Sequence, residues 1–403
     1  MNRLLAGAAK VDITPEKMGL RLGGHAVNRV AVGVRDPLYA RAVALSDGGA
    51  PLVLVGLDLV GLMRGYVEKI RARLPQYAPH RLWVCCTHTH DAPDTIGFWG
   101  PMIREIPLRT GLDAEYMDFL IERVATAIEE AVNDLSPAAA TAAHVLTPSI
   151  GLTRNVRQEG MKDDEIQILQ LTSLAGPVIA TVYNYACHPE FFGHHHRRIS
   201  AGWPGVANER LERMFGGTAL LLQNALGGMV TGATSRDDGV FEPRVGAPFV
   251  GQLGRRIAEY VECGLRENAR PIKVETIATE HAAFLLPIEN KVFRLAARLN
   301  IFPRWMLGQD KKSVITEVNI ARLGPVVMAT LPGEALPEVG FVVKQMLGAP
   351  YPWVLNLACD ELGYLLPESH WRQRNYRYEQ AMSPGSQTVP LIFEKLKELL
   401  RAD

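Results

Sequence analysis

Three hairpin-like segments, each followed by a helical stretch and a further apolar strand, constrain the fold of this 403-residue chain most. In each hairpin, two alternating or β-branched runs flank a turn that contains Gly and Pro, which is typical of antiparallel strand pairs. This repeat predicts an α/β fold with mixed β-sheets and flanking helices, built from three hairpin–helix–strand units. The hairpins are residues 41–58, 165–188 and 314–334, the helical stretches 66–74, 205–214 and 337–347, and the final strands 82–86, 218–222 and 353–357.

Polar side chains that can bind a metal recur where strands of these units end. Asp58, His188 and Glu334 occupy matching points at the ends of the three hairpins. The final strand of the first unit leads directly to His88 and His90. Because open α/β sheets carry their sites beyond the carboxyl ends of their strands, we expect the three units to surround one site.

The rest of the chain adds helices and an insert to these three units. Segments 113–134 and 248–268 have helical periodicity, and no Gly/Ser-rich linker or low-complexity segment divides the chain, so we expect a single domain over residues 1–403. The segment near 284–308 is an insert that contains a basic amphipathic stretch, 291–304. We interpret this stretch as a helix packed on the core with its arginines in water, and a lid or a membrane-surface helix is the alternative.

Composition excludes several classes of protein. The chain has 43 basic and 43 acidic residues, so it lacks the excess positive charge that attracts nucleic acid. No apolar run approaches the ~20 residues of a transmembrane segment. The apolar run before Lys10 is too short for a secretory signal, and the five cysteines have no paired spacing, which predicts a cytoplasmic protein with reduced thiols.

The pair His88 and His90 lies at the end of a predicted strand. Since side chains two residues apart on a strand point to one face, both imidazoles can converge on one metal, or one can bind metal while the other touches substrate. Asp91 and Asp94 follow and can orient the rings as hydrogen-bonding carboxylates. Two ordinary hydrogen-bonded histidines remain the alternative.

Taken one at a time, three further residues are explained by a role in the fold alone, without any chemistry. They are His188, Glu334 and Tyr364. A carboxylate such as Glu334, at the end of an apolar strand, needs a cation or hydrogen bonds to offset its loss of water. Two or more histidines with one glutamate suit Zn²⁺, which in catalytic sites takes three protein ligands and a water whose pKa falls towards ~7.

Several motifs in order along nearly the whole chain give it a family resemblance. The chain resembles the catalytic domain of the neutral/alkaline (non-lysosomal) ceramidases, which are zinc amidases that hydrolyse the N-acyl bond of ceramide. The match is strongest at the Thr-His-Thr-His and Pro-Gly-Glu motifs. The motifs are residues 6–15, 38–42, 87–90, 331–334 and 363–364.

The resemblance implies a ligand set and roles for further residues. By motif position the zinc ligands are His88, His188, Glu334 and Tyr364. His90 would lie beside the reacting carbonyl, and Tyr364 would also stabilise the oxyanion. An arginine that contacts the zinc-side group would be Arg154, with Arg157 as the nearby alternative.

The resemblance therefore predicts a Zn²⁺-dependent hydrolase that cleaves an amide bond of an N-acyl substrate, ceramide-like or smaller, through metal-activated water. The alternatives are a zinc-dependent esterase or lactonase on a non-lipid substrate, and a non-catalytic relative that binds a ligand. The expected partner is a small N-acyl or lipid-like molecule, with transient contact to a membrane surface. The family's secreted members carry a signal sequence and an immunoglobulin-like domain that we do not find here, which favours a minimal cytoplasmic relative.

Overall fold

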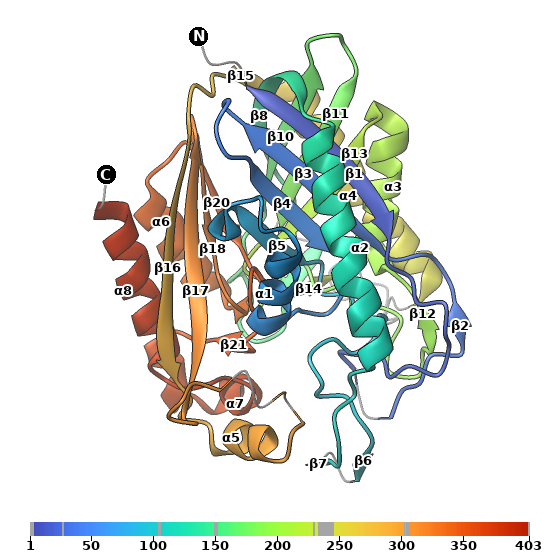
Figure 1. Cartoon of the computed structure of the whole chain (residues 1–403), viewed down its shortest axis with the longest axis vertical. Coiled ribbons are helices and arrows are strands. Elements are labelled where there is room, and N and C mark those ends of the chain that lie inside the picture. The colour runs from blue at the N-terminus through green and yellow to red at the C-terminus, as the bar shows by residue number, and fades with distance from the viewer. Residues whose placement is uncertain are drawn as a thin grey trace.

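The computed structural model describes residues 4–25, 28–103, 106–148, 152–228, 230–232, 246–301, 303 and 307–401 (Figure 1). Its larger sheet has nine strands, which are β1 (Leu5–Asp12), β3 (Tyr39–Ser46), β4 (Leu52–Leu57), β5 (Leu82–Cys86), β8 (Ser136–Leu146), β10 (Glu165–Ser173), β11 (Val178–Tyr185), β13 (Thr218–Gln223) and β15 (Arg270–Ile272). Across this sheet the order is β13, β11, β10, β8, β1, β3, β4 and β5, with β15 also paired to β8.

A second sheet has four strands, and short strand pairs connect the loops. The four strands follow the order β16 (Ile277–Pro287), β17 (Ser313–Leu323), β18 (Val326–Thr330) and β20 (Tyr351–Leu355). The short pairs are β2 (Gly33–Val34) with β12 (Arg198–Ile199), β9 (Thr153–Asn155) with β14 (Val230–Gly232), β6 (Met102–Ile103) with β7 (Ile106–Pro107), and β19 (Glu334–Ala335) with β21 (Tyr364–Leu365).

The three predicted units are present, which confirms the expected mixed α/β fold. In the first unit β3 and β4 are antiparallel, and α1 (Arg64–Arg73) crosses to β5, which is parallel to β4. The second repeats this pattern with β10, β11, α3 (Gly202–Phe215) and β13. The third does so with β17, β18, α6 (Pro337–Leu347) and β20.

The two sheets pack face to face between outer layers of helices. Trp83 and Leu220 from the larger sheet share one buried cluster with Met328 and Trp353 from the smaller. The helices α1, α2 (Ala114–Asn133), α3 and α4 (Ala247–Glu267) pack on the other face of the larger sheet, and α6 and α8 (Thr388–Arg401) on the other face of the smaller. Strands buried on both faces read as continuous apolar runs, as at 52–57.

A buried ion pair joins the two halves of the molecule. Arg71 on α1 donates from Nη1 to Oε2 of Glu317 on β17 at 2.8 Å and from Nη2 to Oε1 at 2.7 Å. Burial opposes ionisation of Glu317, but the hydrogen bonds and charge of Arg71, with the charge of Arg64, outweigh it and lower the pKa of Glu317 to about 2. This bidentate pair therefore ties α1 to the smaller sheet.

The insert agrees in part with the interpretation of a helix packed on the core, since Ala296 belongs to a buried core cluster and Phe293 packs against it, but the helix is shorter than the predicted stretch. Residues up to Pro287 belong to β16, and only Lys291–Arg298 form a helix, α5. Within α5 only Ala296 and Ala297 are buried. The predicted positions Phe302, Arg304 and Met306 lie outside the described residues. In the described part of the chain, the other helical elements are α7 (Arg377–Ala381) and short 3₁₀ turns at Pro79–Arg81, Glu368–Arg372 and Arg374–Tyr376.

Among the residues described, no helix combines the length and the apolar character that crossing a bilayer requires.

Candidate metal centre

His88 lies in the loop that follows β5, where it is held in an unusual backbone conformation. Its φ is +68°, a region that non-glycine residues rarely occupy. The Nδ1 atom lies 2.6 Å from the carbonyl oxygen of Val60. Because a carbonyl can only accept, Nδ1 carries the proton, and Nε2 is left to face Glu334 Oε2 at 3.4 Å.

His188 repeats this arrangement in the loop that follows β11, the second hairpin strand of the second unit. Its Nδ1 donates to the carbonyl oxygen of Val230 at 3.0 Å, and its Nε2 lies 3.3 Å from the same Oε2 of Glu334. The backbone carbonyls thus set the same tautomer in both imidazoles. Such carbonyl partners are the usual means of orienting metal-binding histidines.

Glu334 follows β18 and begins β19, and Tyr364 is its register partner on β21. The candidate ligand atoms of His88, His188 and Glu334 all lie within 4.8 Å of one another, so these residues could hold a metal ion. The donor set fits a metal that displaces the proton from each Nε2: it then offers two ring nitrogens and a carboxylate oxygen, all on buried residues. Tyr364 lines the adjoining pocket.

The charges of the cluster are mutually stabilised. Burial disfavours an ionised Glu334, but the charges and hydrogen bonds of His88 and His188 prevail and hold the pKa of Glu334 well below its usual range. Burial lowers the pKa of His188, yet its hydrogen bond to Glu334 and nearby carboxylates raise it overall. A buried carboxylate that stays ionised is what a cation requires of its ligand.

Gln223, at the end of β13, links the loops that carry the two histidines. Its Nε2 donates to the carbonyl oxygens of Thr87 at 2.8 Å and of Cys187 at 3.2 Å, the residues immediately before His88 and His188. The sequence places Gln223 at a strand end, but nothing in it indicates these two partners, since they come from segments far apart in the chain.

His90 lines the pocket beside the cluster, with its ring centroid 4.9 Å from that of His88. The predicted convergence is present, but strand alternation does not produce it: β5 ends at Cys86, and the irregular backbone at His88 brings the rings together. Within the described part of the chain neither ring nitrogen of His90 has a hydrogen-bond partner. Burial, with the charges of His25 and His88, lowers the pKa of His90 well below its usual value.

The prediction that Asp91 and Asp94 orient the histidine rings is wrong. Asp91 accepts from Arg29 at 2.9 Å, and Asp94 accepts the backbone N–H groups of Ile96, Gly97 and Trp99. Both carboxylates therefore order the loop after His90. Asp58 does not contact the cluster either. Its Oδ2 accepts a hydrogen bond from Arg41 at 2.8 Å.

His25 and Glu190 lie beside His90 and were not predicted as site residues. With His90 they form a second group whose candidate ligand atoms lie within 4.8 Å of one another. The His25 ring stacks edge-on against His90 at 4.8 Å between centroids, and His25 Nε2 lies 3.0 Å from the carbonyl oxygen of Glu190. Glu190 directly follows the His188-Pro189 motif, which is the one signal that the sequence offers.

The two candidate arginines have different surroundings. Arg157 Nε pairs with the buried carboxylate of Glu379 on α7 at 2.5 Å. Arg154, on β9, is half-buried, and its buried Nε has no hydrogen-bond partner among the residues described. Neither belongs to the described residues that line the pocket. The role given to Arg154 therefore stays a prediction.

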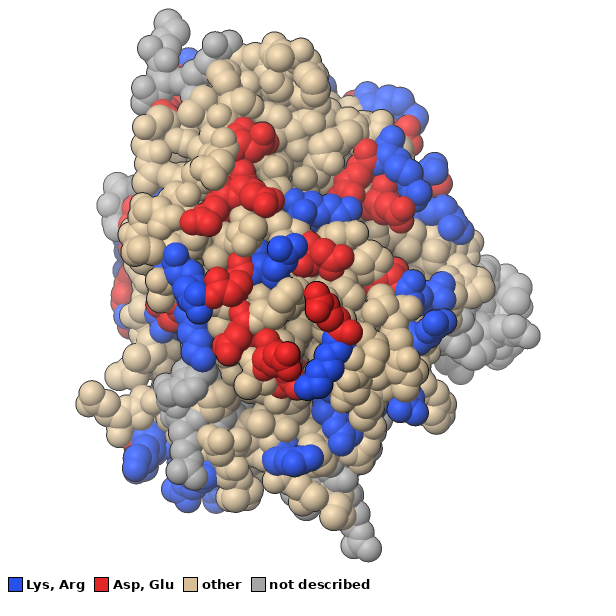
Figure 2. Space-filling view, turned by 45° about the vertical axis from the view of Figure 1, so that its right-hand side comes forward, with Lys and Arg blue, Asp and Glu red and all other residues tan. Residues whose placement is uncertain are grey.

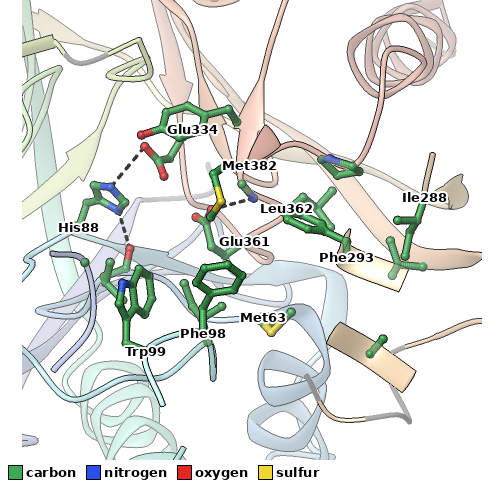
Figure 3. A pocket seen from close by; sticks show the side chains of 18 of the residues that line it. Met63, His88, Phe98, Trp99, Ile288, Phe293, Glu334, Glu361, Leu362 and Met382 are labelled. Atoms are coloured by element: carbon green, nitrogen blue, oxygen red, sulfur yellow. Dashed lines mark hydrogen bonds and ion pairs between the residues drawn. The ribbon is translucent and has the colours of Figure 1, made fainter. Parts of the chain in front are cut away.

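An apolar pocket of about 1000 Å³, including solvent at its mouth, leads to the cluster. Figure 3 shows His88 and Glu334 on one side of it and Ile288 and Phe293 on the other, with Met63, Phe98, Trp99, Leu362 and Met382 around the space between. Glu361 also lines this pocket, and its burial beside Glu334 raises its pKa well above the usual range. The chemistry of the walls suits a substrate with an alkyl portion.

Comparisons with known proteins found a matching family model and solved structures with a similar fold. A family model described as neutral/alkaline non-lysosomal ceramidase, N-terminal, matches residues 4–271, which include His88 and His188 but not Glu334 or Tyr364. A search of curated proteins found no match.

Two solved structures have a similar fold. One is neutral ceramidase from Pseudomonas aeruginosa, with a TM-score of 0.81 at 15% identity over 100% of this chain and 74% of that one. The other is a ceramidase complexed with C2, with a TM-score of 0.79 at 14% identity over 100% of this chain and 75% of that one.

Proposed function

Because the chain belongs to the neutral/alkaline non-lysosomal ceramidase family, we propose that it is a zinc-dependent hydrolase that cleaves the amide bond of an N-acyl substrate. The observation that carries this proposal is the convergence of His88 Nε2 and His188 Nε2 on one oxygen of Glu334. The apolar pocket that ends at this point supports a substrate with an acyl chain, ceramide-like or smaller. A cytoplasmic location stays a prediction from the cysteines.

The residues have distinct parts in the proposed reaction. A zinc ion held by His88, His188, Glu334 and Tyr364 would lower the pKa of a water molecule towards ~7 and polarise the amide carbonyl. Burial and the charge of Glu334 raise the pKa of Tyr364 well above its usual range in the metal-free chain. Its hydroxyl is proposed to stabilise the oxyanion. Arg154 is proposed to position the substrate.

His90 is proposed to carry the proton. Its lowered pKa keeps the imidazole neutral at pH 7, so it can accept a proton from the attacking water and then deliver it to the leaving amine. Both of its ring nitrogens are available for this exchange among the described residues.

His90→Ala should retain zinc while kcat for an N-acyl substrate falls by about 10²–10⁴-fold, the usual contribution of a general acid–base group. Metal content by atomic absorption and steady-state kinetics measure the two effects. His144→Ala, a change of the same type at an exposed histidine paired with Glu165, serves as the control. A fully active His90→Ala enzyme would exclude this role.

A substrate panel separates amide hydrolysis from the alternative reactions. We expect an N-acyl amide to be cleaved with a higher kcat/KM than an ester or a lactone of the same chain length. The measurement uses zinc-loaded wild-type protein and follows release of the fatty acid or hydroxy acid. Preference for the ester or the lactone would replace the amidase assignment, and protein that neither holds zinc nor hydrolyses any member of the panel would be a non-catalytic relative.

A further inference from the structure

The helix α5 has two apolar faces, and only one of them faces the pocket. Phe293 and Ala297 line the pocket, whereas Val292, Leu295 and the C-cap residue Leu299 lie on the side away from it and are 54–62% exposed. A helix that served only as a wall would need one apolar face. The second face therefore calls for a partner outside the described chain.

The orientation of α5 is set by its N-terminal cap. Asn290 accepts the backbone N–H groups of Val292 and Phe293 through Oδ1. Its Nδ2 donates to the carbonyl oxygens of Ala381 and Ser383, beside the pocket residue Met382. The exposed face is thus presented by a helix that is attached to the pocket wall.

A second element adds apolar side chains at the same end of the molecule. Ile103 and Leu108, in and beside the β6–β7 hairpin, are 62% and 59% exposed. The chain leading to this hairpin touches the chain leaving α5, since a Cβ on Gly97 would lie 2.7 Å from the carbonyl oxygen of Ile301. Figure 1 shows α5 and β6–β7 together at the lower end of the molecule. We call Ile103, Leu108, Val292, Leu295 and Leu299 the pocket rim.

Positive charge accompanies the pocket rim. The segment 289–312 contains six basic residues and two acidic ones, in a chain whose formal net charge is zero. Lys291 and Arg298 on α5 and Lys311 and Lys312 before β17 are exposed. On the face in Figure 2, Asp and Glu alternate with Lys and Arg in the middle, whereas the lower end shows Lys and Arg among uncharged residues.

We propose that the pocket rim docks on a lipid surface with anionic headgroups. This inference rests on the proposed function. The apolar side chains would enter the boundary between headgroups and acyl chains, and the basic side chains would pair with the headgroups. The pocket mouth would then open onto the lipid layer, so that an N-acyl lipid enters without crossing water. A second copy of the chain fits less well, because a two-fold contact would bring the same positive charges together.

The test is co-sedimentation of the zinc-loaded protein with vesicles of phosphatidylcholine, with and without phosphatidylglycerol. We expect binding to the anionic vesicles that weakens as salt rises. The triple change Val292→Ser, Leu295→Ser and Leu299→Ser should lower the partition coefficient at least about tenfold. The double change Lys291→Glu and Arg298→Glu should also lower it by about tenfold or more, since each basic side chain contributes about fivefold.

The matched control replaces three exposed apolar side chains elsewhere, Val32→Ser, Leu146→Ser and Leu174→Ser, and should leave vesicle binding unchanged. The midpoint of thermal unfolding verifies that each variant is folded. Equal binding of the rim variant and the control variant would overturn the proposal. So would a rim variant that changes only the oligomeric mass, because the rim would then be a self-association surface.

Failure of the proposed function is a separate outcome. Vesicle binding that depends on the pocket rim, without hydrolysis of any N-acyl substrate, would refute the amidase and keep the docking surface. If wild-type protein hydrolyses a dispersed short-chain N-acyl substrate but does not bind anionic vesicles, the docking surface is refuted and the amidase is kept.

Discussion

Glu334→Gln should abolish stoichiometric zinc binding and lower kcat/KM for an N-acyl substrate by at least about a thousandfold. The amide keeps the shape of the side chain but removes the negative charge that faces His88 Nε2 and His188 Nε2. Loss of the metal removes several kcal/mol of transition-state stabilisation, and about 4 kcal/mol corresponds to a thousandfold in rate. Metal analysis of purified protein and steady-state kinetics give the two readouts.

The control for this variant is another carboxylate that pairs with a histidine. Glu338 Oε1 lies 2.9 Å from His370 Nε2, in a pair that does not line the pocket among the residues described. Glu338→Gln should leave zinc content and kcat/KM close to those of the wild type. A Glu334→Gln protein that keeps both its zinc and its rate would show that the cluster is not the metal centre.

Arg71→Met should lower the free energy of unfolding by about 3–5 kcal/mol, the usual cost of removing one partner from a buried ion pair. The change leaves Glu317 charged and buried between α1 and the smaller sheet, without its bidentate donor. Urea denaturation followed by circular dichroism measures the difference. Arg213→Met, which breaks the exposed pair of Arg213 with Glu209, should have little effect.

The pH dependence of this difference has a definite sign. Glu317 has a pKa of about 2 in the folded chain, against 4.5 for an ordinary glutamate, so the pair stabilises the fold fully above pH 4.5. That contribution is lost as the pH falls from 4.5 towards 2, because only the unfolded chain binds a proton in this range. The stability gap between wild type and Arg71→Met should therefore narrow in acid, and a gap that widens would contradict the assignment.

The fold could be predicted from the sequence because the signals for each unit are local. In each unit the apolar runs, the Gly/Pro turn and the helical periodicity are adjacent in the chain, so hairpin, helix and strand are all visible at short range. The helix predicted at 337–347 has these bounds in the structure, and the predicted helix at 113–134 corresponds to Ala114–Asn133.

The site was less accessible to sequence reasoning because its parts act through distant partners. The candidates His88, His188 and Glu334 could be named as metal-capable residues at strand ends. The partners of Asp91 and Asp94 could not, since Arg29 and the loop N–H groups compete for these carboxylates only once the loop is folded. The same limit applies to α5, whose residues show an amphipathic pattern but not which apolar side chains remain exposed.

The sequence by itself determined the three units, the mixed α/β class and the residue types that carry the chemistry, because hydrophobic period and turn propensity depend on near neighbours. Only the tertiary structure decided that His88 and His188 share a tautomer and face one oxygen of Glu334. That outcome depends on carbonyl groups of Val60 and Val230 and on the amide of Gln223, which packing brings from separate segments. Directional hydrogen bonds between distant segments exist only after the sheets have packed, so no local pattern can encode them.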